Sequence, residues 1–148
     1  ESLDFLLSQT FHDSYFDFIG NQGWFRRGGE RAVFSQQPIE AGYTAEACSI
    51  AFEVTGQSRY VSLADAAVEW LLGRNRLGVR LYDLANGACS DGLEPQGASM
   101  NQGAESIICC LLGLLAVSRL VEKKVETEDD DAPFSATALP SSASASSA

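Results

Sequence analysis

The sequence has little positive charge, a single histidine and no Cys-x-x-Cys pair. Only 10 Lys and Arg residues stand against 20 Asp and Glu residues, so the formal net charge is −10. An acidic chain repels phosphate backbones and anionic lipid headgroups, which predicts no nucleic-acid partner and no membrane partner. No uninterrupted run of 18 apolar residues marks a membrane span, and no basic-then-apolar leader precedes a cleavage site.

The four cysteines lack the spacing of a zinc site or a redox motif. Cys48, Cys89, Cys109 and Cys110 lie among apolar residues, where cysteine commonly behaves as a small buried hydrophobe. Reduced thiols of this kind are typical of a cytoplasmic protein. No glycine-rich phosphate loop follows a strand, and no nucleophile-elbow pattern is present. We therefore predict no metal, no cofactor and a cytoplasmic location.

Apolar periodicity predicts a mostly α protein. The expected helices cover residues 2–11, about 41–55, about 59–72 and 104 to about 123. The short turn between the second and third helices makes them an antiparallel αα-hairpin. Residues 12–34 alternate aromatic and polar positions between glycine-rich turns, which indicates a loop with one short β-hairpin.

The last helix has almost no polar face between Ile107 and Val117, so we expect other helices to surround it. Because one αα-hairpin and a short first helix cannot do so, we expect residues 1–123 to be an incomplete domain. Residues 124–148 are first acidic and then rich in Ser and Ala, which predicts a disordered tail.

A long connection between the third and fourth helices, residues 73–105, concentrates most of the polar candidates. Loops of more than about 12 to 15 residues in compact domains are usually functional or disordered. This loop carries apolar anchors at Leu77, Val79 and Leu81, so we predict an ordered loop that bears a site.

Several motifs in this region resemble a known family. WLLGRN, LYD, GACSDGLEP and NQGAES occur in this order, preceded by the hairpin QQPIEAGYTAEACSIAFEVTGQSRY. Together, over about residues 16–117, they resemble bacterial proteins built as (α/α) toroids that are often described as glycosyltransferases or found beside sugar-active enzymes. The resemblance implies six helical hairpins with a carbohydrate-facing rim. This chain would supply the C-terminal portion, with the N-terminal part of the same toroid as its partner.

Carboxylates in the loop are the catalytic candidates, because glycoside chemistry uses one as an acid and another as base or nucleophile. The predicted set is Asp91, Glu94 and Glu105, with Asp83 behind them. The alternative roles are structural. Asp83 and Asp91 could close turns, and Glu105 could favour the first turn of the last helix.

Polar and aromatic side chains complete the predicted sugar site: Arg74, Asn75, Asp83, Asn101, Gln102 and Trp24. Trp24 is the best candidate for stacking on a sugar ring, because polar and glycine-rich sequence surrounds it. Asn101 could instead be a helix N-cap, and Arg74 could meet a helix C-terminus. His12, followed by Asp13, favours a surface or capping role over catalysis.

Two functions from different classes remain open. The parent protein could be a glycosyltransferase-like or glycosidase-like enzyme. Alternatively, the domain could bind sugar, or act as a scaffold, without catalysis and serve a separate transferase.

Overall fold

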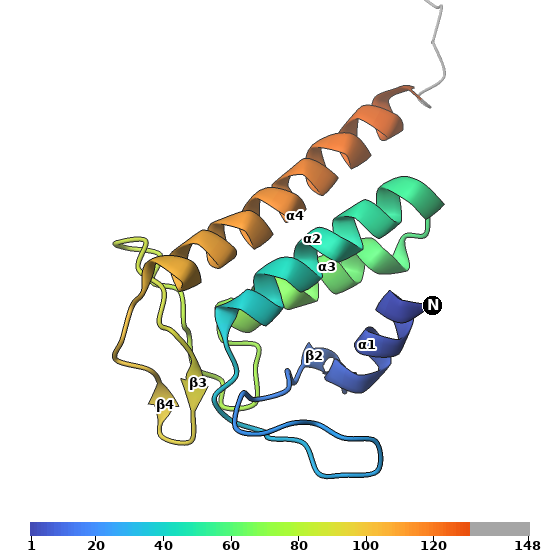
Figure 1. Cartoon of the computed structure of the whole chain (residues 1–148). Coiled ribbons are helices and arrows are strands. Elements are labelled where there is room, and N and C mark those ends of the chain that lie inside the picture. Colours follow the sequence, from blue (N-terminus) through green and yellow to red (C-terminus); the bar gives the residue numbers. More distant parts are fainter. Residues whose placement is uncertain (131–148) are drawn as a thin grey trace, which may run out of the picture.

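The computed structural model describes the backbone of residues 1–130 and the side chains of residues 1–123. The described residues form four helices and two small antiparallel hairpins, so the predicted mostly α class is confirmed (Figure 1). The elements are α1 (Ser2–Thr10), β1 (Phe11–His12), β2 (Tyr15–Phe16), α2 (Pro38–Thr55), α3 (Arg59–Leu71), β3 (Leu93–Glu94), β4 (Gly97–Ala98) and α4 (Ala104–Asp130).

The αα-hairpin forms as predicted, but α2 begins earlier than residue 41. Pro38 occupies the first turn, where its missing N–H costs nothing. Gln37 and Glu40 form a capping box, in which the Gln37 backbone N–H donates to Glu40 Oε2 at 2.6 Å. The helix ends at Gly56, whose φ of 68° gives the left-handed turn toward α3.

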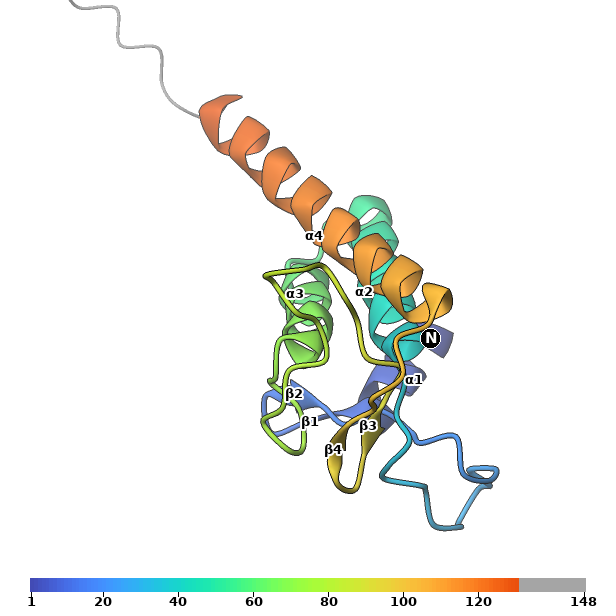
Figure 2. The same ribbon diagram turned by 90° about the vertical axis from the view of Figure 1, so that its left-hand side faces the viewer.

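Helix α4 crosses α2 at a pair of glycines. A Cβ at Gly42 would lie 2.2 Å from the Cys109 carbonyl oxygen, and a Cβ at Gly113 would lie 3.2 Å from Gly42 Cα. The two backbones therefore approach as closely as they do only because neither position has a side chain. Figure 2 shows α4 lying along the α2–α3 pair, with both hairpins below the lower ends of these two helices.

Only one side of α4 is covered by the described residues. Cys110, Ala116 and Leu120 are buried, whereas Ile108, Leu111, Leu112 and Leu115 remain exposed. The expectation that helices surround this segment is thus not met by the described residues.

Ala104–Lys123 is long and apolar enough to cross a membrane, and a third of it is buried. Because core helices of soluble proteins show the same composition, the absence of a membrane partner stays a prediction.

The first hairpin lies near the start of the chain, as predicted. Its turn is at Asp13 and Ser14, which both have positive φ, and not at the glycine-rich segments further along. The second hairpin, β3–β4, was not predicted and exceeds the single hairpin expected from sequence. The Leu93 N–H donates to Gln36 O at 2.8 Å, and the Ser35 N–H donates to Leu93 O at 2.9 Å. These bonds join the long loop to the segment before α2.

Helix α4 continues through Asp130, beyond the predicted end near residue 123. The predicted disordered tail therefore begins with helical residues. Its remainder, residues 131–148, lies outside the described part of the chain.

The α2–α4 contact generates a stability prediction. Gly42→Ala should lower the free energy of unfolding by about 1–3 kcal/mol, because overpacking against a backbone carbonyl outweighs the helix preference of alanine. Urea denaturation followed by circular dichroism measures this. The control on the same helix is Val54→Ala, since Val54 is exposed and its truncation should change stability by no more than about 0.5 kcal/mol. Equal effects of the two substitutions would contradict the close contact.

Candidate functional site

The start of the long loop is organised by Asn75, a predicted sugar ligand. Asn75 is buried, and its amide nitrogen donates to Trp70 O at 2.9 Å and to Val79 O at 2.7 Å. Its Oδ1 accepts the N–H groups of Leu77 and Val79. The side-chain amide therefore uses both its donors and its acceptor oxygen within the loop, and a role for Asn75 as a sugar ligand stays a prediction.

Asp91 caps helix α4 from across the loop. Its Oδ1 accepts the Gly103 N–H and the Ser106 hydroxyl, both at 2.6 Å. The hydrogen bond from Ser106, followed by that from Gly103, lowers the pKa of Asp91 below its usual range. An ionised cap suits the positive end of the helix dipole, and it cannot serve as a general acid near neutral pH. Asn101 is a predicted sugar ligand with an N-cap as its alternative role, and its main-chain carbonyl accepts the Asp91 N–H at 2.9 Å.

The other two predicted catalytic carboxylates lie in different surroundings. Glu94 is half-buried in β3, and its Oε2 accepts the Ser35 hydroxyl at 2.8 Å. Ser35 has a positive φ of 59° and also accepts the Gln22 amide at 2.9 Å. Glu105 is exposed on the first turn of α4, where its charge is favourable to the helix dipole.

Two further candidates lie apart from the loop pocket described next. Arg74 is exposed and forms an ion pair with Glu69 at the end of α3. Trp24 is 87% exposed in the 21–30 segment. His12 is exposed and donates to Gln9 O at 3.0 Å, which agrees with its predicted capping role.

A surface pocket of about 330 Å³ brings two predicted ligands together. Asp83 and Gln102 come from opposite ends of the loop, yet both line this pocket beside the Tyr82 ring. Asp83 Oδ1 accepts the Ala85 N–H at 2.8 Å, so it also closes a turn as the alternative interpretation predicted. The complete lining is Arg80, Leu81, Tyr82, Asp83, Leu84, Ala85, Ser90 and Gln102.

A buried charge cluster around Asp17 was not predicted from the sequence. The Asp17 carboxylate is 3% exposed, pairs with Arg31, and accepts Arg76 Nε at 3.0 Å and Gln36 Nε2 at 2.8 Å. Gln36 Oε1 in turn accepts the Trp70 indole N–H at 3.1 Å. Burial alone would raise the pKa of Asp17, but the hydrogen bonds and charges of its partners outweigh it and hold the pKa below its usual range.

This cluster left one signal in the sequence. Asp17 stands between Phe16 and Phe18, which are both buried and stack at 4.9 Å. An acid enclosed by core aromatics must find partners, because an unpaired buried charge is costly.

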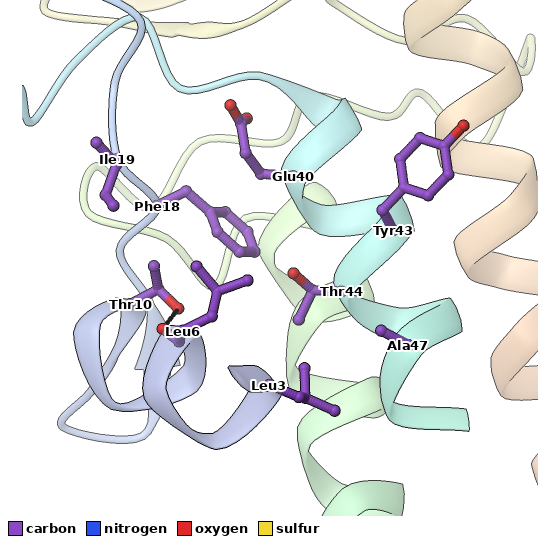
Figure 3. Close-up of a pocket in the computed structure, with 9 residues that line it drawn as sticks. All are labelled: Leu3, Leu6, Thr10, Phe18, Ile19, Glu40, Tyr43, Thr44 and Ala47. Carbon is purple, nitrogen blue, oxygen red and sulfur yellow. Dashed lines mark hydrogen bonds between the residues drawn. The ribbon is translucent and has the colours of Figure 1, made fainter. Parts of the chain in front are cut away.

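Glu40 was also not predicted, because its burial depends on the packing of α1 against α2 and not on the local sequence. It borders an apolar pocket of about 380 Å³ between α1 and α2 (Figure 3). Burial raises the pKa of Glu40 to about 7, even though the Gln37 N–H donates to it. Glu40 is therefore a carboxyl group that titrates near neutral pH at the edge of a cavity.

The Asp17 cluster predicts a large loss of stability on truncation. Asp17→Ala leaves Arg31 and Arg76 without their carboxylate, which should cost about 3–5 kcal/mol of unfolding free energy. Asp17→Asn keeps the shape and should cost less. Chemical denaturation tests both variants against Asp65→Ala, a control at an exposed position of α3. A loss below about 0.5 kcal/mol for Asp17→Ala would show that the cluster is not structural.

Glu40 predicts a pH-dependent stability. Because its pKa rises from 4.5 unfolded to about 7 folded, the folded state binds more protons between these values, and stability falls as pH rises through this window. Glu40→Gln keeps an acceptor for the Gln37 N–H but cannot ionise. Its melting temperature should therefore fall less than that of the wild type between pH 5 and pH 7.5. Glu46→Gln on the same helix is the control, and parallel curves for Glu40→Gln and wild type would refute the shift.

Comparisons of the chain with protein-family models, curated proteins and solved structures find no match.

Proposed function

We propose that this chain is the carbohydrate-binding C-terminal portion of an (α/α)-toroid protein, and that the loop pocket contacts the sugar. The observation that carries the proposal is the convergence of Asp83 and Gln102 beside Tyr82. These residues belong to the motifs that resemble sugar-active toroids. Their meeting in one pocket supports the part of the resemblance that concerns the loop.

The chemistry of the pocket suits a polyhydroxylated ligand. A primary amide such as Gln102 both donates and accepts, as a sugar hydroxyl does, and Ser90 and Asp83 add a hydroxyl and a carboxylate. The Tyr82 ring offers an apolar surface beside these groups, and Arg80 adds donors. A few polar groups placed around an apolar wall are typical of small-molecule sites.

The helical arrangement supports the toroid. The α2–α3 pair is an antiparallel hairpin, and α4 leaves Ile108, Leu111 and Leu115 exposed. In a toroid such a face would be buried against neighbouring helices, which here would be those of the N-terminal part of the same domain. Contiguous apolar surface on a soluble protein usually marks an interface.

The role of Asp91 as a helix cap favours a second candidate function, which is glycan binding by this chain without catalysis. Asp91 Oδ1 accepts hydrogen bonds from Gly103 and Ser106. A glycosyltransferase-like or glycosidase-like activity would use Glu94, Glu105 or the Oδ2 atom of Asp91, together with further groups from elsewhere in the toroid.

Glycan binding tests the proposal directly. The chain is titrated with gluco-, manno- and galacto-configured oligosaccharides and followed by calorimetry. We expect binding of at least one, weakened about 5- to 10-fold by Tyr82→Ala or Gln102→Ala, as expected for one lost stacking or hydrogen-bonding contact.

Arg74→Ala is the matched control, because Arg74 is in the same loop but pairs with Glu69 outside the pocket. It should leave affinity unchanged. Absence of any glycan binding would reject the function, and binding that is weakened by Arg74→Ala but not by the pocket variants would move the site elsewhere.

A further inference from the structure

An apolar cavity lies away from the loop pocket, between α1 and α2. Leu3 and Leu6 of α1 face Thr44 and Ala47 of α2 across it, and Phe18 lies between them (Figure 3). Its volume of about 380 Å³ falls in the range of small-molecule sites, which are mostly apolar with few polar groups. Nothing in the proposed sugar site uses this cavity.

A second pocket of about 380 Å³ adjoins the first and differs from it in charge. Leu6 and Ile19 line both, so the two pockets are neighbours with a shared wall, and together they are called the joined site. The second pocket adds Arg26 and Arg27 from the 21–30 segment, with Phe5 as a further apolar wall. An apolar cavity thus lies next to a pocket lined by two arginines.

Neither arginine has a carboxylate partner among the described residues. Arg31, Arg59, Arg74 and Arg76 pair with carboxylates, whereas Arg26 and Arg27, like Arg80 and Arg119, form no ion pair there. Of these four, Arg26 and Arg27 are the two that line the pocket next to the apolar cavity. The overall charge is −10, yet residues 20–34 hold three arginines against one glutamate, a local net of +2. A planar guanidinium without a carboxylate is suited to bind an external carboxylate or phosphate.

We propose that the joined site binds a single-chain anionic amphiphile, with the alkyl chain in the α1–α2 cavity and the anionic head on Arg26 and Arg27. The apolar lining supplies the energy for the tail and excludes a free inorganic anion as the preferred ligand. The two positive charges of Arg26 and Arg27 at the second pocket favour a negatively charged head group. A monomeric ligand fits better than an anionic bilayer, because the acidic chain as a whole is repelled by such a surface.

The probe is decyl phosphate below its critical micelle concentration, titrated into the full chain and followed by calorimetry. We expect saturable one-to-one binding that decyltrimethylammonium, with the same tail and opposite charge, does not reproduce. Inorganic phosphate should bind far more weakly. Tighter association with phosphatidylglycerol vesicles than with the monomer would overturn the proposal in favour of a membrane surface.

Two kinds of substitution distinguish the contribution of the anionic head group to binding from that of the alkyl tail. The double substitution Arg26→Ala and Arg27→Ala should weaken decyl phosphate about tenfold, the size of one lost charge-assisted hydrogen bond, and leave decanol binding unchanged. Ala47→Trp should fill the cavity and abolish both. If Ala47→Trp does not fold, Leu6→Asn at a half-exposed position replaces it. This substitution places a polar group in the wall of the cavity and should weaken the binding of both ligands.

The charge-matched control is the double substitution Arg74→Ala and Arg119→Ala, which removes two exposed arginines outside both pockets. It should bind like the wild type. Equal weakening by the two double variants, or unchanged binding after the cavity is filled, would refute the site. Glycan binding at the loop pocket is measured in parallel, so the failure of either proposal is visible without the other.

Discussion

The arrangement of the segments around the helices depends on the ion pairs and hydrogen bonds of the buried Asp17 carboxylate. Through Arg31 it holds the segment before α2, through Arg76 it holds the start of the long loop, and through Gln36 it reaches the Trp70 indole on α3. Three stretches of chain that are distant in sequence, around residues 17, 31–36 and 70–76, therefore meet at one charge. Burying that carboxylate costs several kcal/mol unless every partner is in place, so these segments adopt their positions together.

The helices could be read from the sequence because their causes are local. Apolar spacing, Pro38 and Gly56 act within one or two turns. The place of the β3–β4 hairpin in the fold could not be predicted, because it is set by the pairing of Leu93 with Gln36, a residue distant in the sequence. Such contacts depend on how distant segments are brought together. The earlier start of α2 lies between these two cases. Its signal, the Gln37–Glu40 capping box, is local in the sequence, but the apolar spacing alone places the start of the helix later.

Residue type alone does not separate ligand-binding from structural roles in the long loop. Polar residues such as Asn75 and Asp91 in a glycine-rich loop suggest a ligand, but a long ordered loop must also satisfy its own backbone groups. Asn75 satisfies groups on both sides of a turn, and Asp91 satisfies the first turn of α4. Asp83 and Gln102, which make fewer internal bonds, are the ones that reach the pocket. In such a loop, binding is left to the side chains that folding does not need.

The two proposed sites differ in the interactions that would stabilise a bound ligand. The loop pocket offers hydrogen-bonding groups that water already satisfies, so its ligand must replace those bonds closely, and affinity per contact is small. The α1–α2 cavity offers apolar surface, where burial of each CH₂ group contributes about 0.8 kcal/mol. Arg26 and Arg27 then decide which amphiphile is accepted, since a cationic head would meet like charge. Selectivity in the first site comes from matched hydroxyls, and in the second from the sign of one head group.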